Sequence, residues 1–538
     1  MPRSRAVPAI IFVVALSALV GGLLGRSAQA TDDKLVRHQK TFTAALAAIE
    51  AQYIDKVESD RLVYGAISGM LQTLDPHSSF FSPREYAQMR ERQEGHYYGL
   101  GITIVAIDGD ITVQNLFEGS PAYKKGVRRG DIIAKILGED AKGWTSDQAV
   151  RKLRGPKGTF AQIGLKRRGY DQLITLDVPR DEITIPTITS YFMVDATTGY
   201  VRLQDFAENT DRDLGHALHE LASQGMRRLL LDLRGNPGGP LDQAIRVANR
   251  FLPKGRMIVY TRGRVTNSDQ DYRATEDTEF TDLPIVLLAN RNSASAAEIV
   301  TGALQDHDRA YIVGETTFGK ALVQSVYRIS GGAGLALTTA HYYTPSGRLI
   351  QRPWDSTFDE YLTYTLRDQA PREHKPTDLK HTDAGRPVYS GGGIEPDRRV
   401  DGPIEGFSPT KFGRQIYGRG EFSNFAQRFM ADGDTRIAVE GKDRRIVRST
   451  FVVDDAMVAE FREQLKTDKV KIDEDGFKKD QEFIKAMIRY EIDVAIFSLA
   501  DARRHLIAVD PQAQQALTLF PEAQKLTDLA RTSAKPGE

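Results

Sequence analysis

Between residues 183 and 352, short continuous apolar runs alternate with amphipathic segments, and this alternation restricts the fold more than any other feature. Residues 228–233 and 285–289 are apolar runs of strand length, as expected of strands that are covered on both faces. Residues 241–252 and 296–304 carry apolar side chains at helical spacing. Strands and helices that alternate in this way predict an α/β fold, with helices layered on a sheet.

The regions that flank this core have different patterns. Residues 31–96 carry apolar side chains every three or four positions, which is typical of helices. Residues 97–182 hold short apolar runs separated by Gly and Pro, which indicates a β-rich module with one helix near residues 146–153. Residues 353–405 resemble loops, and the chain is helical and highly charged from Val452 onward. We therefore predict five regions: a leader (1–30), a helical region (31–96), the β-rich module (97–182), the α/β core (183–400) and a helical C-terminal region (401–538).

The first 30 residues do not belong to the folded body. Arg3 and Arg5 form a basic start, residues 8–25 are apolar or small throughout, and residues 27–30 have the small-residue spacing of a cleavage site. The apolar run is long for a signal peptide and short for a membrane-spanning helix. A cleaved signal peptide and a retained anchor in the inner membrane therefore stay open, with a buried helix as a third alternative. Both main alternatives predict export to the periplasm.

Composition and missing motifs exclude several classes of protein. The chain has 72 Lys plus Arg and 72 Asp plus Glu, so it lacks the basic excess of a nucleic-acid-binding protein. It has no cysteine, which excludes disulfides, thiolate nucleophiles and cysteine zinc sites. Neither a G-x-S-x-G elbow nor an H-E-x-x-H zinc motif occurs. His216 and His219, without a third ligand, are interpreted as a surface pair. We expect no metal and no cofactor.

The first segment that points to chemistry is a glycine-rich turn after an apolar strand, residues 231–239 with the sequence LDLRGNPGG. Gly238 and Gly239 allow backbone N–H groups to approach a ligand, next to a helix N-terminus that favours negative charge. Such donors are typical of an oxyanion hole. A tight strand-to-helix turn without function explains the same residues.

Two further segments point to a nucleophile and a base. In residues 292–298, NSASAAE, Ser295 and Glu298 fit the capping box Ser-x-x-Glu. A serine at a helix N-terminus is also well placed as a nucleophile, because the helix dipole favours an oxyanion there. In residues 318–324, FGKALVQ, Lys320 has apolar and glycine neighbours. Burial would lower the pKa of such a lysine and make it a usable base, whereas the simpler alternative is a lysine on a surface loop.

Together, the three segments resemble the carboxyl-terminal processing proteases, a family of tail-specific peptidases with a Ser–Lys pair. Lys320 lies 25 residues after Ser295, and Gln324 lies four residues after Lys320; both offsets match the family pattern. The resemblance implies that Ser295 is the nucleophile and Lys320 the general base. It also implies that Gln324 orients the lysine.

The resemblance further implies a crotonase-like, layered βαβ peptidase core. The oxyanion hole would be formed by the N–H groups of Gly238, Gly239 and Ala296. Gln324 meets a geometric difficulty, because residues four apart on a plain strand are about 13 Å apart. Its contact with the lysine therefore requires the segment to turn. Ala297 stands where many family members have serine, a position that is not the nucleophile.

The β-rich module resembles a PDZ domain inserted before the core. Residues 98–102, YGLGI, resemble the loop in which successive backbone N–H groups hold a peptide's terminal carboxylate while the peptide adds as a strand. Residues 119–122, 126–133 and 153–159 also match the PDZ pattern in order. The resemblance implies a substrate-binding loop made of Gly99, Leu100, Gly101 and Ile102.

These features predict a serine endopeptidase that captures and cleaves envelope proteins near their C-termini. The expected partners are proteins with flexible C-terminal tails, together with a second copy of the chain through the helical regions and an adaptor protein; we expect no nucleic acid. Two alternatives are a PDZ-bearing envelope scaffold without catalysis and a crotonase-type acyl-CoA enzyme. The joint presence of Ser295 and Lys320 argues against the scaffold, and the PDZ insertion and export signal argue against the acyl-CoA enzyme. Residues 401–538 contain no functional motif.

Overall fold

The computed structural model describes residues 34–167, 170–354, 361, 363–366, 373–433 and 448–533. The predicted leader, residues 1–30, lies outside the described residues. Within the described ranges, no helix combines the length and the apolar character needed to cross a membrane. The chain forms two compact units: residues 1–83 with 326–337, and residues 84–325 with 338–538.

The smaller unit consists of helices and one short strand pairing. A helix covers residues 34–52, and α2 follows at Ser59–Gln72, so the helical pattern predicted for this region is confirmed there. Strand β1 (Ser79–Phe81), which the sequence did not predict, pairs antiparallel with residues 334–336 of β18 (Gly334–Tyr343). Its pairing partner lies more than 250 positions away in the sequence, beyond the range of local patterns.

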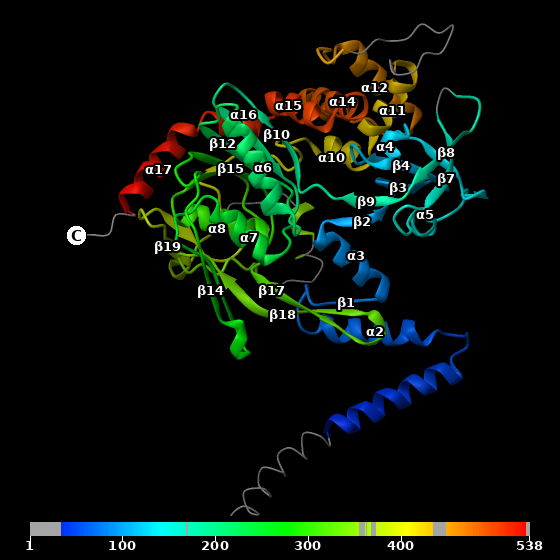
Figure 1. Cartoon of the computed structure of the whole chain (residues 1–538), viewed down its shortest axis with the longest axis horizontal. Helices are drawn as coiled ribbons and strands as arrows, with labels where there is room; N and C mark the ends of the chain where they lie inside the picture. Colours follow the sequence, from blue (N-terminus) through cyan, green and yellow to red (C-terminus); the bar gives the residue numbers. More distant parts are fainter. Residues whose placement is uncertain are drawn as a thin grey trace, which may run out of the picture. The chain divides into compact units, whose positions relative to one another are not determined.

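The α/β core is built around a six-stranded sheet in the larger unit (Figure 1). The two predicted apolar runs form neighbouring parallel strands of this sheet, β12 and β15, and the sheet is parallel except for its edge strand β10. In sheet order the strands are β10 (Ile188–Met193), β11 (Thr198–Leu203), β12 (Arg228–Asp232), β15 (Ile285–Ala289), β16 (Ala310–Gly314) and β21 (Arg398–Arg399).

Helices cover both faces of this sheet, as the continuous apolar strands require. Leu229 and Leu231 pack among residues of α6, α7 and α8, whereas Leu230 packs with residues of α15, α16 and α17. The predicted layered α/β core is therefore confirmed, and the C-terminal region supplies one of its layers (Figure 1). The six helices are α6 (Thr210–Ser223), α7 (Leu241–Asn249), α8 (Ala296–Asp306), α15 (Leu499–Val509), α16 (Pro511–Leu517) and α17 (Phe520–Ser533).

A second sheet contributes side chains to the apolar core that also contains residues of α7 and α8. Strand β13 (Met257–Gly263) pairs with β14 (Gln270–Arg273) and with residues 340–343 of β18. Strand β17 (Leu322–Arg328) also pairs with β18. Strands β17 and β18 matter for the site, because β17 follows the predicted base and β18 carries a buried tyrosine described below.

The predicted β-rich module is a six-stranded antiparallel sheet with its own apolar core. Its helix α5 covers Ser146–Leu153, as predicted, because Thr145 and Gln148 form a reciprocal capping box that fixes where the helix begins. The connecting strands β2 (His96–Gly99) and β9 (Asp181–Thr184) pair with each other. The other elements are β3 (Ile102–Ile107), β4 (Asp110–Leu116), α4 (Pro121–Lys124), β5 (Ile132–Ile136), β6 (Glu139–Asp140), β7 (Phe160–Lys166) and β8 (Ile174–Pro179).

The C-terminal region is helical, and its remaining helices enclose a separate apolar cluster. Phe483, Ile484, Met487 and Ile488, which recur at helical spacing, are buried in this cluster. In the described part of residues 353–405 the strands are short: β19 (Leu379–His381), β20 (Pro387–Tyr389) and the edge strand β21. The cluster helices are α10 (Lys411–Gly418), α11 (Glu421–Gly433), α12 (Asp455–Thr467), α13 (Glu474–Lys479) and α14 (Gln481–Ile496).

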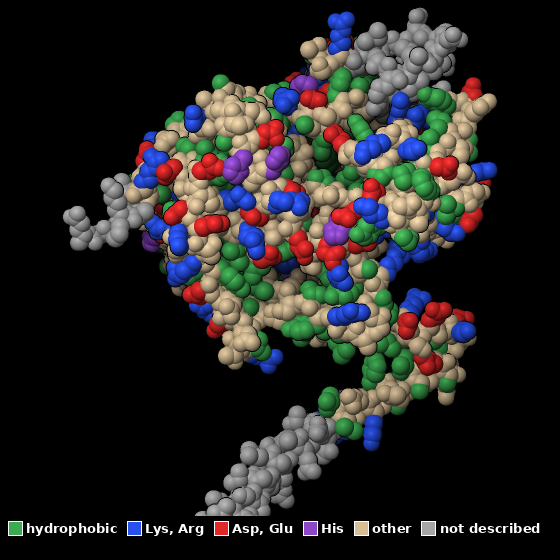
Figure 2. Space-filling view, viewed as in Figure 1, with side chains coloured by type: hydrophobic (Ala, Val, Ile, Leu, Met, Phe, Trp, Pro, Cys, Tyr) green, Lys and Arg blue, Asp and Glu red, His purple; other side chains and the backbone are tan. Residues whose placement is uncertain are grey.

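Charged side chains of both signs are interspersed on the face of the molecule drawn in Figure 2. Lys and Arg lie among Asp and Glu there, in keeping with the equal numbers of basic and acidic residues in the sequence. The described residues on this face form no extended basic surface of the kind that binds nucleic-acid phosphates.

Candidate active site

Three loops that follow strands of the central sheet carry the predicted catalytic residues. Strand β12 runs into the glycine-rich turn, β15 into residues 290–295, and β16 into residues 315–321. Because the carboxyl ends of parallel strands meet at one edge of a sheet, the three loops converge. The topology thus brings together motifs that are separated by up to about ninety positions in the sequence.

The backbone at Ser295 has an uncommon conformation. Ser295 precedes α8 with φ 54° and ψ −115°, a region that residues with a Cβ rarely adopt. Gly238, with φ 93°, lies against it: a Cβ built on Gly238 would come within 2.6 Å of the Ser295 Cβ and 2.8 Å of the Ala296 nitrogen. Only glycine fits there, so the glycine-rich turn and the serine loop are in direct contact.

The N–H groups of the predicted oxyanion hole differ in their bonding. Gly238 donates its N–H to the Oδ1 of Asn236 at 2.8 Å, and the buried Asn236 amide donates to the Leu203 carbonyl at 2.9 Å. In this conformation the Gly238 N–H is therefore committed to the turn. Gly239 and Ala296 are the predicted donors that are not tied to Asn236.

Ser293 and Asn290 fasten the serine loop to the glycine-rich turn. The Ser293 hydroxyl donates to the Leu233 carbonyl at 2.8 Å and accepts the Asn290 N–H at 2.9 Å. The Asn290 side-chain oxygen accepts the Gly235 N–H at 2.9 Å. The Ser293 carbonyl also accepts the Phe318 N–H at 2.9 Å, which extends the same network to the lysine loop.

Lys320 lies in the loop between β16 and β17, and its Nζ donates to the Oε1 of Gln324 at 3.2 Å. On a plain strand, residues four apart are too far from each other for such a contact. The contact forms because Lys320 precedes the strand, and its long side chain reaches Gln324, the third residue of β17.

A buried glutamate joins the serine loop to the lysine loop. The Glu298 Oε2 accepts the N–H groups of Ser295 and Lys320, each at 2.9 Å. Its Oε1 accepts the Gly319 N–H at 2.7 Å and the Thr317 hydroxyl at 2.5 Å. Burial raises the pKa of Glu298, and these donors oppose the shift. The capping-box pattern accounted only for the contact with Ser295, because nothing in the sequence brings residues 317–320 to the carboxylate.

Tyr342, in β18, makes a second bridge between the same loops. Its hydroxyl lies 2.6 Å from the Lys320 carbonyl and 3.1 Å from the Ser295 carbonyl. Burial raises the pKa of Tyr342 well above its usual range, so the phenol stays neutral and able to donate. Tyr342 was not predicted from the sequence, because no motif marks a tyrosine on a strand of the second sheet.

The histidines that could have suggested a metal site do not converge. His216 pairs with Glu220 at 3.5 Å and His219 with Glu279 at 2.7 Å, and both histidine side chains are exposed. The interpretation as a surface pair is confirmed. Within the described ranges, no three His, Asp or Glu side chains are grouped so that they could hold a metal ion.

A cavity of about 440 Å³ lies at the predicted carboxylate-binding loop of the PDZ-like module. The Arg154 guanidinium lies 4.8 Å from the centre of the Tyr97 ring and pairs with Glu91 of α3 (Pro83–Glu94). Burial raises the pKa of Tyr97 to about 12, and this shift is opposed by the Arg154 guanidinium and, to a smaller extent, by the backbone N–H groups of Gly101 and Ile102. The loop N–H groups thus face a side chain of the protein itself. Besides these residues, Gly99, Leu100, Phe117 and Leu153 line the cavity.

Comparison with known proteins places this geometry in a family. Family models match the chain at residues 197–355 (peptidase family S41), 88–166 (PDZ domain) and 23–83 (activating protease CtpB N-terminal domain). The chain is 41% identical over 307 residues to a carboxy-terminal-processing protease of Bartonella bacilliformis, a match that covers 56% of this chain and 70% of that protein. It is 34% identical over 343 residues to the carboxy-terminal processing protease CtpA of Bacillus subtilis, covering 64% and 71%.

A solved structure of a photosystem II D1 C-terminal processing protease is also similar, at 28% identity with a TM-score of 0.35, over 68% of this chain and 93% of that chain. The two sequence relatives support the assignment, because the chain covers more than two thirds of their length at 41% and 34% identity. The chain therefore belongs to the carboxy-terminal processing proteases, serine-type peptidases of family S41, and contains a PDZ domain.

Proposed function

We propose that this protein is an endopeptidase that cuts exported envelope proteins near their C-termini, with Ser295 as nucleophile and Lys320 as general base. The observation that carries the proposal is that one carboxylate oxygen binds both residues. The Glu298 Oε2 accepts the backbone N–H groups of Ser295 and Lys320, each at 2.9 Å. Such a carboxylate fixes the spacing between nucleophile and base, as general-base catalysis requires.

The proposed chemistry is an acyl transfer in two halves. The neutral Lys320 amine takes the proton of the Ser295 hydroxyl as its oxygen attacks the scissile carbonyl carbon. The N–H groups of Gly239 and Ala296 donate to the resulting oxyanion. Lys320 then returns the proton to the departing amine, and water, deprotonated by the same lysine, hydrolyses the acyl-enzyme. Gln324 holds the amine in place through its bond to Nζ.

The PDZ domain would capture the substrate's tail. The cavity beside Gly99, Leu100 and Ile102 lies against a loop whose backbone N–H groups can bind a terminal carboxylate, and the Arg154 guanidinium borders it. The Tyr97 hydroxyl now faces this loop. We therefore propose that an arriving carboxylate replaces it there.

We further propose that the protein works outside the cytoplasm and associates with itself. The basic start, apolar run and small-residue site in the first 30 residues support export. Leu35, Phe42 and Ile49 recur every seven positions on the helix over residues 34–52, and each is more than 40% exposed. An apolar stripe of this kind supports pairing with a second copy, and the C-terminal helices offer surface for an adaptor protein.

The test is cleavage of a partly unfolded protein that ends in a flexible apolar tail. We expect the wild-type chain to cut near the tail, and Ser295→Ala and Lys320→Ala each to lose several orders of magnitude in kcat/KM while both keep the fold, since nucleophile and base act as a unit. A Lys320→Ala variant with near-normal turnover would refute the Ser–Lys assignment. A wild-type chain that bound tails without cutting them would favour the scaffold alternative.

A further inference from the structure

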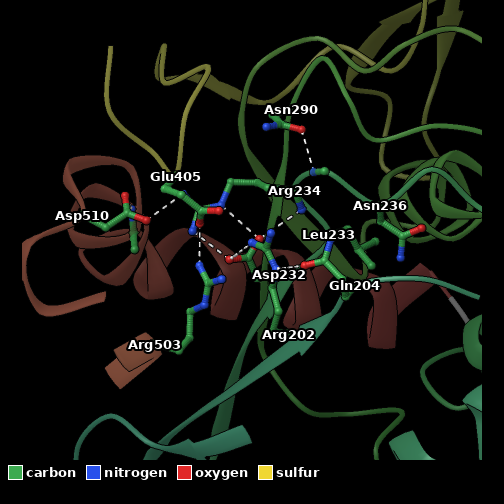
Figure 3. Close-up of polar contacts among 12 residues, drawn as sticks. Arg202, Gln204, Asp232, Leu233, Arg234, Asn236, Asn290, Glu405, Arg503 and Asp510 are labelled. Carbon is green, nitrogen blue, oxygen red and sulfur yellow. Dashed lines mark hydrogen bonds and ion pairs between the residues drawn. The ribbon is translucent and has the colours of Figure 1, made fainter. Parts of the chain in front are cut away.

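A buried charge cluster connects the strand before the glycine-rich turn to the C-terminal helices (Figure 3). Its three cations and three anions balance, and five of the six side chains are buried while the sixth, a glutamate, is partly buried. The buried charge cluster consists of Arg202, Asp232, Arg234, Glu405, Arg503 and Asp510.

Arg234 is at the centre of this cluster and is shared between the two regions. Its Nε and Nη2 donate to the two oxygens of Asp232 at 3.0 and 2.7 Å. Its Nη1 lies 2.7 Å from the Oδ2 of Asp510 and donates to the Oε1 of Gln512 at 2.9 Å. One guanidinium therefore contacts Asp232 at the end of β12 and both Asp510 and Gln512 of the C-terminal segment.

On the side of the active site, Arg234 is the residue that leads into the glycine-rich turn. Its own N–H donates to the Asp232 carboxylate at 3.0 Å, and the next residue, Gly235, donates to Asn290 of the serine loop at 2.9 Å. The turn then continues to Gly238, which touches Ser295. A shift of Arg234 would therefore displace the glycine-rich turn, including Gly238, which lies against Ser295.

On the other side, Asp510 and Gln512 are themselves fixed. Asp510 caps α16 by accepting the Ala513 N–H at 2.9 Å, and the Gln512 amide donates to the Val400 carbonyl at 2.6 Å. Gly406 packs onto the pair: a Cβ built there would lie 1.9 Å from the Asp510 Oδ1 and 2.6 Å from the Arg234 Nη1. The C-terminal helices thus present a rigid set of acceptors to the guanidinium.

We propose that Asp510 and Gln512 are positioning residues for the peptidase reaction, holding Arg234 and, through it, the backbone of the oxyanion turn. This inference rests on the proposed function, and it assigns to the C-terminal helices a part in catalysis that no motif indicates. The physical reason is that a buried guanidinium deprived of acceptors moves toward new ones, because an unpaired buried charge is unfavourable. A turn that supplies backbone donors to an oxyanion loses much of its effect when those donors shift.

The test compares three single substitutions on the same helix. Asp510→Asn removes the charge but keeps the helix cap, since Asn caps as well as Asp. Gln512→Ala removes the neutral bond to Arg234 together with the bond that the Gln512 amide donates to the Val400 carbonyl. Gln514→Ala is the matched control, because Gln514 is exposed and donates to the Ile507 carbonyl instead.

Two measurements are made on each full-length variant: amide hydrogen exchange of peptides that cover residues 234–240, and steady-state cleavage of the tailed substrate. We expect exchange in the turn to become about tenfold faster in Asp510→Asn and Gln512→Ala. We expect kcat to fall about tenfold to a hundredfold, with KM and the affinity for a free-tail peptide changed less than about threefold. The control should match the wild type in both measurements.

Two results would overturn the inference: wild-type exchange and kcat in both variants, or faster exchange spread evenly over the whole core. Gln512→Ala keeps the test decisive if Asp510→Asn does not fold, because it leaves all charges in place. The exchange measurement needs no activity, so a wild-type chain that failed to cleave would refute the proposed function while the coupling of turn and helices was still decided.

Discussion

Two regions of the molecule are held in place by different kinds of contact. One consists of the loops that carry Ser295 and Lys320, and the other is the cavity beside Gly99 and Leu100, here called the PDZ groove. Glu298 and Tyr342, which join the serine and lysine loops, are both almost completely shielded from water. In the groove, by contrast, the ion pair between Arg154 and Glu91 leaves about a third of each side chain exposed. One region is fixed by buried hydrogen bonds, and the other by contacts that water and salt can reach.

This difference indicates how the two regions work. Buried hydrogen bonds are costly to leave unmade, so the loops that carry the reacting groups have one stable arrangement. A half-exposed ion pair contributes little and is screened by salt, so a substrate can replace it at small cost. Under the proposed function, the active site is therefore preorganised, and the proposed tail-binding groove can exchange its own contacts for those of a tail.

Among substitutions outside the proposed nucleophile and base, the largest effect should follow from removing the acceptor that joins their two loops. In Glu298→Gln the side chain keeps one acceptor oxygen but presents an NH₂ group to one of the two pairs of donors. We expect kcat to fall about a hundredfold or more, because nucleophile and base lose their common anchor. Steady-state kinetics with the tailed substrate would measure this, with the exposed Glu279→Gln as control. A near-normal kcat in the folded variant would show that the loops are fixed without Glu298.

A smaller effect is expected at Gln324. Gln324→Ala removes the acceptor of the Lys320 amine but leaves both catalytic groups and the bonds of Glu298 in place. We expect kcat to fall about tenfold through poorer orientation of the base, with KM unchanged. If kcat fell equally in Gln324→Ala and Lys320→Ala, an orienting role for Gln324 would be contradicted. A residue that only orients the base should matter less to kcat than the base itself.

In the PDZ groove, substitutions and salt should change KM and leave kcat almost unchanged. A substrate whose C-terminus is amidated should show a KM about tenfold higher, because the loop then lacks a carboxylate to bind. Removing the Tyr97 hydroxyl in Tyr97→Phe should lower the KM for the free-tail substrate a few-fold, since the tail no longer replaces a bound group. Equal KM values for free and amidated tails would contradict tail recognition.

The smallest expected effect concerns stability in acid. Burial favours protonation of Glu405, but Arg503, Arg202 and Arg234 outweigh it and lower the pKa of Glu405 to about 2. A depressed carboxyl pKa stabilises the fold fully above about pH 4.5, and this contribution is lost as the pH falls toward 2. Thermal unfolding measured between pH 7 and pH 3 should therefore show a steeper acid loss in the wild type than in Glu405→Gln. Parallel curves would indicate that Glu405 is not stabilised by the arginines.

The sequence predicted the elements that depend on local pattern and missed those that depend on which loops meet. Strands β12 and β15 were readable because both faces of the sheet are covered, so that β15 is apolar throughout and β12 has the apolar centre Leu229–Leu231. The role of Glu298 beyond a capping box, and the contact from Lys320 to Gln324, follow from the path of the lysine loop, which no spacing rule specifies. The bond from Arg234 to Gln512 joins residues 278 positions apart, and no local signal marks such a pair.

The backbone of Ser295 has a consequence for heat resistance. A residue with a Cβ in this conformation is strained by about 1–3 kcal/mol, and alanine would keep that strain because it keeps the Cβ. Glycine would relieve it and lose only about 0.5–1 kcal/mol through its freer unfolded chain. The inactive Ser295→Gly protein should consequently melt at a higher temperature than the active enzyme, so that the family's reaction is maintained at the expense of thermal stability.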